Sequence, residues 1–169
     1  MKILVRLYKI NSGKILIDNI NIEDININHL RENIVYVNQN TQMYNNTILY
    51  NIQYGNNTNK NYIENIIKKY NITVFDSLKN GIYSNVGISG GEISLGMQKI
   101  IVILRGILRR SKIIIFDEPL SSVDKKNRKK ILDMIKGECK KQTVLIITHD
   151  MEIIPYCNKV INFNKINNS

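Results

Sequence analysis

Two adjacent carboxylates, Asp117 and Glu118, end an apolar run in a chain of 169 residues. The run Ile113 to Phe116 has the branched and aromatic side chains of a buried parallel strand. The carboxyl ends of such strands open onto the edge of a sheet where ligands bind. One carboxylate there could hold a nucleotide-bound Mg²⁺, while the other could orient or deprotonate an attacking water. Carboxylates that only cap a turn are the alternative interpretation.

Two further polar residues follow strand-like runs. His149 closes the segment 143–149 and precedes a helix expected over 151–157. Gln39 closes the segment 34–39. Alone, a histidine in such a place is more often a cap or a surface residue, and a glutamine there carries almost no information. Their interpretation therefore depends on what surrounds the carboxylate pair.

The residues after Glu118 decide between these interpretations. Pro119-Leu-Ser-Ser-Val-Asp124 is a continuation that capping does not predict. With it, the sequence resembles the nucleotide-binding domains of ATP-binding-cassette (ABC) proteins. Asp117 and Glu118 look like the Walker B pair of that family, and Ser121 to Asp124 looks like its D-loop. The resemblance implies ATP and Mg²⁺ as cofactors, with Asp117 on the metal and Glu118 on the attacking water.

The same resemblance assigns roles to Gln39 and His149. In this family a histidine at the end of the next strand reaches the γ-phosphate, and His149 stands in that place. Gln39 resembles the Q-loop glutamine, which contacts the metal and the water and joins the ATPase core to its helical subdomain. We therefore expect Gln39 to act as a catalytic residue and as a metal ligand. The segment Thr47 to Gly55 is similar to the exporter branch of the family, although Asn38 stands where proline is usual.

Two pentapeptides, Ile88 to Glu92 and Ile93 to Met97, resemble the Leu-Ser-Gly-Gly-Gln signature of the family. The family places the first signature residue about two dozen positions before the Walker B aspartate, a distance set by one helix and one strand. Ile93 lies 24 positions before Asp117, whereas Ile88 lies 29 positions before it. Five extra residues would lengthen the packed helix by about 7.5 Å. Ile93 to Met97 is therefore the predicted signature, and Ser89-Gly90-Gly91 belongs to the preceding loop.

The predicted signature differs from the family motif. Ser94 would cap the following helix, and backbone N–H groups near Gly96 would face the γ-phosphate bound by an opposing subunit. Leu95 replaces the first glycine and Met97 replaces the glutamine, which predicts a weakened composite site. In a head-to-tail dimer with a second ABC cassette, Ser94, Gly96 and Asp124 would act across the interface.

The phosphate-binding loop of the family does not occur in these residues. No GxxxxGK followed by Ser or Thr is found in the 169 residues, so they supply no backbone cradle and no lysine for the phosphates. Arg6 to Asn19 resembles the segment after the Walker A helix, which makes Met1 to Tyr8 the expected remainder of that helix. We therefore expect an N-terminally truncated cassette, with Met1 an internal methionine or the edge of a split gene.

The elements that must position these residues alternate between strand and helix, which predicts a mainly parallel sheet. The expected fold is one α/β domain with a RecA-like P-loop NTPase core, 1–38 and 110–169, and an inserted helical subdomain, 39–109, that includes the signature helix. The expected strands are 14–18, 34–39, 112–118, 143–149 and 159–163, and the expected helices are 26–33, pieces of 47–83, 94–109, 124–136 and 151–157. The chain has 33 isoleucines and 25 asparagines throughout its length, so apolar periodicity is less informative than usual.

The formal net charge is +10, with basic runs at 109–110, 125–130 and 136–141. A nucleic-acid footprint would explain such runs, but no aromatic residue interleaves them to stack on bases. We interpret the runs as solvated helix faces and expect no nucleic-acid partner. Cys139 and Cys157 are single and far apart, so they predict neither a metal site nor a disulfide framework.

The function expected from the resemblance is the ATP-binding and ATP-hydrolysing cassette of an exporter-type ABC transporter. A membrane-spanning domain, on another chain or upstream, would hold it at the cytoplasmic face of a membrane, because no apolar run here reaches the ~20 residues of a spanning helix. A non-catalytic pseudo-cassette that dimerises with an intact ABC ATPase and regulates it is the alternative. A soluble ABC protein acting on nucleic acid fits least well. The transported substrate is not encoded in these residues.

Overall fold

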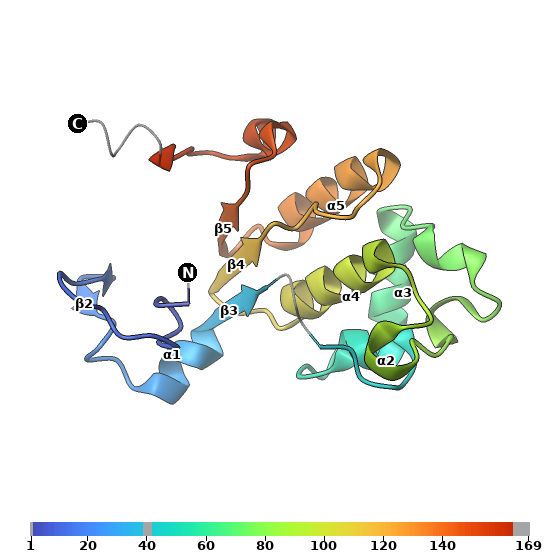
Figure 1. Cartoon of the computed structure of the whole chain (residues 1–169), viewed down its shortest axis with the longest axis horizontal. Coiled ribbons are helices and arrows are strands. Elements are labelled where there is room, and N and C mark those ends of the chain that lie inside the picture. Colours follow the sequence, from blue (N-terminus) through green and yellow to red (C-terminus); the bar gives the residue numbers. More distant parts are fainter. Residues whose placement is uncertain (1, 39–41, 164–169) are drawn as a thin grey trace.

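A parallel sheet lies at the centre of the fold. The computed structural model describes residues 2–38 and 42–163. β3 (Ile34–Val37), β4 (Ile113–Asp117) and β5 (Thr143–Ile147) lie in the order β3-β4-β5. Both strand pairs are parallel, so the three carboxyl ends meet at one edge of the sheet (Figure 1). The predicted α/β fold with a parallel sheet is confirmed.

One face of the sheet packs on two long helices. α4 (Leu95–Leu108) and α5 (Lys125–Glu138) lie against it (Figure 1). Side chains alternate along a strand, so Ile114 and Phe116 of β4 point into this layer, where both are fully buried. Burying side chains of this size stabilises a fold by about 1.5–3 kcal/mol each. This layer therefore holds in place the strand that ends at Asp117, directly before Glu118.

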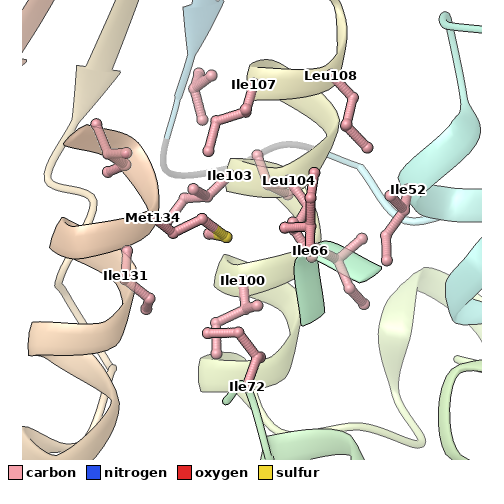
Figure 2. Close-up of a cluster of buried hydrophobic side chains, with 14 of the residues drawn as sticks. Ile52, Ile66, Ile72, Ile100, Ile103, Leu104, Ile107, Leu108, Ile131 and Met134 are labelled. Carbon is pink, nitrogen blue, oxygen red and sulfur yellow. The ribbon is translucent and has the colours of Figure 1, made fainter. Parts of the chain in front are cut away.

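Shorter helices cover the other side of α4. They are α2 (Ile48–Gln53), α3 (Lys60–Lys69) and 3-10 turns at Val74–Ser77, Gly81–Tyr83 and Ile88–Gly90. Figure 2 shows Ile52 and Ile66 of these helices on one side of α4 and Met134 of α5 on the other. Arg105 of α4 adds a polar contact, because its Nε donates to the backbone oxygen of Asn51 at 2.7 Å. Within residues 2–38 and 42–163, every helix is too short or too polar to span a bilayer.

Gly106 lets α4 approach β3 closely. A Cβ atom at this position would overlap Cγ2 of Val37. Glycine within a helix destabilises it by roughly 0.5–1 kcal/mol relative to alanine. The close contact is the physical reason for a glycine here.

The opposite face of the sheet is covered by the N-terminal segment. Val5, together with Leu30 of α1 (Ile27–Asn33), packs on Ile34 and Ile115. The cover is thinner near β5, whose residues 144–147 are only half-buried. Within the described residues β5 pairs with β4 alone, so it is an edge strand there.

Two sequence predictions differ from the structure in the N-terminal region. The predicted strand 14–18 is a two-residue strand, β1 (Leu16–Ile17), which pairs antiparallel with β2 (Ile20–Asn21) outside the main sheet. Asp18 and Asn19 have φ values of 50° and 65°, the conformation of a tight two-residue hairpin turn. Residues 2–6 form turns instead of the expected helix, because so short a segment does not offset the cost of helix nucleation.

The C-terminal differences have local causes. The predicted helix 151–157 is the 3-10 helix Met151–Tyr156, in which Pro155 lacks the N–H that an α-helical turn requires. The predicted strand 159–163 is wrong: within the described part of the chain these residues pair with no strand, and Val160, Ile161 and Phe163 are all more than half exposed. The helices predicted at 26–33, 94–109 and 124–136 are confirmed as α1, α4 and α5.

Candidate functional site

Asp117 is the last residue of β4, at the edge where the carboxyl ends meet. Its Oδ2 atom accepts a hydrogen bond from the hydroxyl of Tyr36 on β3 at 2.5 Å. Burial raises the pKa of Tyr36 to about 12, and the hydrogen bond to Asp117 and its negative charge add to the shift. Tyr36 is therefore a neutral donor at ordinary pH, and it fixes the orientation of the Asp117 carboxylate.

Glu118 and His149 meet at the same edge. Nδ1 of His149 lies 2.8 Å from Oε1 of Glu118, and the backbone N–H of His149 donates to that oxygen at 3.2 Å. The hydroxyl of Thr148 donates to Oε2 at 3.3 Å. The His149 side chain is 90% exposed, whereas that of Glu118 is 24% exposed. The imidazole thus reaches solvent while one of its nitrogens is held by the carboxylate.

A tight turn after β4 positions Glu118. Its φ is 50°, a left-handed conformation that costs a residue with a side chain roughly 1–3 kcal/mol. The N–H of Glu118 donates to the oxygen of Ile147 at 2.9 Å, and its carbonyl accepts from Oγ of Ser121 at 2.9 Å. These bonds offset the strain and direct the carboxylate towards the end of β5.

Lys99 of α4 is a buried lysine within the electrostatic influence of the two carboxylates. The residue is 7% exposed, and its Nζ has no hydrogen-bond partner within residues 2–38 and 42–163. Burial lowers the pKa of Lys99, while the charges of Asp117 and Glu118 act in the opposite direction. Lys99 therefore belongs to the electrostatics of the site, although the sequence motifs do not include it.

The helix after the two signature candidates starts where the spacing argument predicts. Ser94 is the N-cap of α4, and its Oγ accepts the N–H of Met97 at 3.2 Å. Ile88–Gly90 forms a single 3-10 turn, in which Ser89 has a φ of 52°. The predicted cap at Ser94 is confirmed, and Ser89 lies in the preceding loop. That Ser94 faces a nucleotide stays a prediction.

Gly96 and Leu95 give the first turn of α4 two different surfaces. A Cβ atom at Gly96 would lie 3.0 Å from the carbonyl oxygen of Ser122, so the signature turn touches the D-loop of the same chain. Leu95 is 67% exposed, at the position where the family motif has a glycine. The helix start therefore presents a bulky apolar side chain to solvent where the motif would present backbone.

Asp124 ends the D-loop as the N-cap of α5. Its carboxylate accepts the N–H of Asn127 at 3.1 Å and the side-chain amide of Asn127 at 2.7 Å, and these bonds lower the pKa of Asp124. Arg128, in the next turn, donates to the oxygen of Val123 at 3.1 Å and to Oδ2 of Asp150 at 2.8 Å. Arg128 thereby joins the D-loop to the segment that follows β5.

The donors present suit a metal ion that arrives with a nucleotide. Mg²⁺ in such sites takes one or two carboxylates, with phosphates and water in the other positions. Asp117 supplies one carboxylate, and no group of three His, Cys, Asp or Glu side chains able to hold a metal occurs in the part of the chain that the structure describes. Gln39, the other predicted metal ligand, lies outside the described residues, so its contacts stay a prediction.

Four residues of the site carry no motif signal: Tyr36, Lys99, Thr148 and Arg128. Tyr36 has a usable indirect signal, since it lies opposite Ile115 in the parallel register and alternation puts Ile115 and Asp117 on one face. Thr148 is singled out by no pattern. Arg128 belongs to a basic run that reads as a solvated helix face.

Comparison with known proteins agrees with this geometry. The sequence matches the ABC transporter family over residues 1–121. It is 41% identical over 165 residues to the ABC transporter ATM1 of Plasmodium falciparum (isolate 3D7), which covers 96% of this chain and 16% of that protein. It is 31% identical over 163 residues to the ATP-dependent lipid A-core flippase of Haemophilus influenzae (strain 86-028NP), covering 94% of this chain and 28% of the flippase.

The fold matches a solved structure as well. A bacterial Atm1-family ABC exporter with ATP bound aligns with a TM-score of 0.80 and 28% identity, over 90% of this chain and 27% of the exporter chain. The chain thus spans less than a third of the length of each of these relatives. By its motifs, its sequence match and its fold, the chain belongs to the ABC transporter family and corresponds to part of the nucleotide-binding domain of its exporters.

Proposed function

We propose that the chain binds and hydrolyses ATP as the cassette of an exporter-type transporter, together with a second cassette and a membrane-spanning domain. The observation that carries this proposal is the 2.8 Å contact between Glu118 and His149 at the carboxyl ends of β4 and β5. A carboxylate held by an imidazole can take a proton from a water molecule at a defined atom. Mg²⁺ and ATP, when bound, would supply the phosphoryl group and neutralise its developing charge.

Each candidate site residue has a proposed role in hydrolysis. Glu118 is the general base, oriented by His149 and by the hydroxyl of Thr148. Because Nδ1 of His149 is engaged by Glu118, the other ring nitrogen is left to face a γ-phosphate. Asp117, oriented by Tyr36, is the carboxylate that binds Mg²⁺. Gln39 would contact the metal and the attacking water.

The signature side of the chain would complete a site on the second cassette. In a head-to-tail pair, Ser94, Gly96 and Asp124 face the phosphate loop of the partner. The contact between Gly96 and Ser122 supports this arrangement, because it puts the signature turn and the D-loop on one surface. In that composite site the GxxxxGK loop comes from the partner, since these 169 residues contain none.

A location and a domain organisation follow from the same function. Residues 39–109 would form the helical subdomain, and the remainder would form the RecA-like core. The membrane-spanning domain would hold the cassette at the cytoplasmic face of a membrane. Its helices, and not the cassette, would choose the transported substrate.

A second candidate function is a pseudo-cassette that pairs with an intact ABC ATPase and regulates it without turnover of its own. The exposed Leu95 in the signature turn favours it, because an apolar side chain there separates the helix start from a phosphate. The contact between Glu118 and His149 favours the catalytic cassette.

The test mixes this chain with an intact exporter cassette and measures ATP turnover. Ser94→Arg should abolish the turnover that depends on this chain, because the arginine would fill the space next to the partner's phosphates. Ser89→Arg is the matched control, in the neighbouring loop, and should leave turnover unchanged. Equal effects of the two substitutions would refute the signature assignment. The pseudo-cassette is favoured if adding this chain lowers the ATP turnover of the intact cassette, and if Glu118→Gln in this chain leaves that lowered turnover unchanged.

A further inference from the structure

A basic cavity lies at the end of the sheet opposite the candidate nucleotide site. Its volume is about 440 Å³, and it is lined by the C-terminal end of α4, the turn before β4 and the turn between α5 and β5. Lys112, at its rim, directly precedes β4, and Asp117 ends that strand. At ~3.3 Å per strand residue the two ends are roughly 16 Å apart. The cavity is therefore separate from the carboxylate pair.

Two of the basic runs in the sequence converge on this cavity. Arg110 comes from the run 109–110, Lys140 and Lys141 come from the run 136–141, and Lys112 adds a fourth cation. None of the four forms an ion pair in the described ranges 2–38 and 42–163. Solvated helix faces, the interpretation from sequence, do not account for this convergence of cations around one hollow.

The carboxylate that lines the cavity does not neutralise these cations. Glu138 accepts hydrogen bonds from Nζ of Lys69 at 2.7 Å, from the hydroxyl of Tyr70 at 2.8 Å and from the hydroxyl of Tyr62 at 3.1 Å. Burial acts to raise the pKa of Glu138, but these hydrogen bonds outweigh it and the pKa is lowered. Glu138 is thus ionised and already paired with Lys69, so the cavity keeps an excess positive charge.

Arg110 is held in position by its backbone and by an aromatic ring. Its φ is 53°, and its N–H donates to the oxygen of Ile107 at 3.1 Å. The guanidinium lies 5.4 Å from the centroid of the Tyr62 ring, a cation–π contact. The neighbouring turn is tied down as well, because Nε2 of Gln142 donates to the oxygen of Ser111 at 2.8 Å. The Arg110 guanidinium and the neighbouring turn are therefore held in place, while the three lysines are exposed.

We propose that this cavity binds a polyphosphate group, a compact anion with at least two phosphates. Like charges gathered in one hollow repel one another, and a multiply charged ligand relieves that repulsion. Arginine offers paired donors to phosphate oxygens, and lysines act as mobile point charges. A cavity of this volume accepts a small ligand. A free polyphosphate and the headgroup of a phosphorylated inositol lipid share this chemistry.

The test measures binding of inorganic triphosphate to the full 169-residue chain by calorimetry, without Mg²⁺. Lys140→Gln with Lys141→Gln should weaken binding at least ten-fold, and Arg110→Gln should do the same. The matched control is Lys125→Gln with Lys126→Gln, an equal loss of charge on exposed residues outside the cavity, which should change the dissociation constant less than two-fold. Thermal melting confirms that each variant is folded.

Further arms of the experiment identify the source of the phosphates. Vesicles of phosphatidylcholine with a few per cent of a bisphosphorylated inositol lipid should retain the chain if a lipid headgroup is the ligand. If the chain binds these vesicles no more tightly than it binds free triphosphate, the ligand is assigned as a soluble polyphosphate. Equal weakening by the cavity pair and the control pair, or binding of polyglutamate or RNA as tight as that of triphosphate, would overturn the proposal.

Discussion

The hydroxyl of Tyr36 donates to Oδ2 of Asp117 across two neighbouring strands, at 2.5 Å. A half-buried tyrosine thus orients the carboxylate that the family resemblance places on the metal. Tyr36→Phe removes this donor and leaves the ring, so the free energy of unfolding should fall by about 1 kcal/mol. Denaturant unfolding at pH 7 measures the change. Tyr8→Phe, at a residue that is 61% exposed, is the control and should have no measurable effect.

The alkaline limb of the stability profile gives a second test of the Tyr36 contact. The pKa of Tyr36 is raised to about 12, above its ordinary value of 10.0, so the folded state keeps a proton that the unfolded state loses between these values. Stability contributed by Tyr36 is therefore present below pH 10 and is lost as pH rises towards 12. Tyr36→Phe should lose less stability than the wild type over this range. Parallel curves for the two proteins would contradict the contact.

Asp124 should give the opposite dependence on pH. Hydrogen bonds from Asn127 lower its pKa, so the folded state favours the ionised cap. Its contribution is present above the ordinary aspartate pKa and is lost as pH falls through the lowered value. Asp124→Ala should reduce the free energy of unfolding by about 0.5–2 kcal/mol at pH 7. The difference from the wild type should shrink in acid, and a difference that stays constant down to pH 2 would be evidence against the cap.

Gly106→Ala should destabilise the protein in spite of the higher helix propensity of alanine. The new methyl group would overlap Val37, and overpacking of a core typically costs about 1–3 kcal/mol. Asn65→Ala is the matched control, at an exposed interior position of α3, where alanine should be neutral or slightly stabilising. Chemical unfolding of both variants provides the comparison.

Arg128 should couple the D-loop to the segment after β5. It bonds the backbone oxygen of Val123 and the carboxylate of Asp150, so Arg128→Gln removes a link between two loops. Because these charges are partly exposed, the loss of stability should be small, below about 1 kcal/mol. Amide hydrogen exchange should nevertheless accelerate in residues 121–124 and 150–152. Lys129→Gln, one residue further on and exposed, should leave exchange at both segments unchanged.

The elements that the sequence predicts well are those with two independent signals. β4 and β5 combine β-branched runs with a polar residue at the carboxyl end, and α4 and α5 combine a capping residue with a long helical pattern. The incorrect strand at 159–163 had one signal, a short apolar run, in a chain where isoleucine is common everywhere. Strand formation also needs a partner edge, which a single segment of sequence does not reveal.

Side-chain geometry at the site was predictable only in part. The positions of Asp117, Glu118 and His149 at one edge follow from parallel strands, and Ser94 as a cap follows from the length of the next helix. The hydrogen bond from Tyr36 and the buried side chain of Lys99 depend on which faces of β3 and α4 turn inward. Tertiary packing sets those orientations, so local patterns do not specify them.

The close approach of Gly96 to the carbonyl oxygen of Ser122 ties the evolution of two motifs together. A side chain at position 96 is tolerated only if the D-loop backbone retreats, and a shift of that backbone alters the surface offered to a partner. Leu95, which points outward, is under no such constraint. Among descendants of this sequence, replacements at position 96 should therefore occur only with compensating changes in residues 121–124.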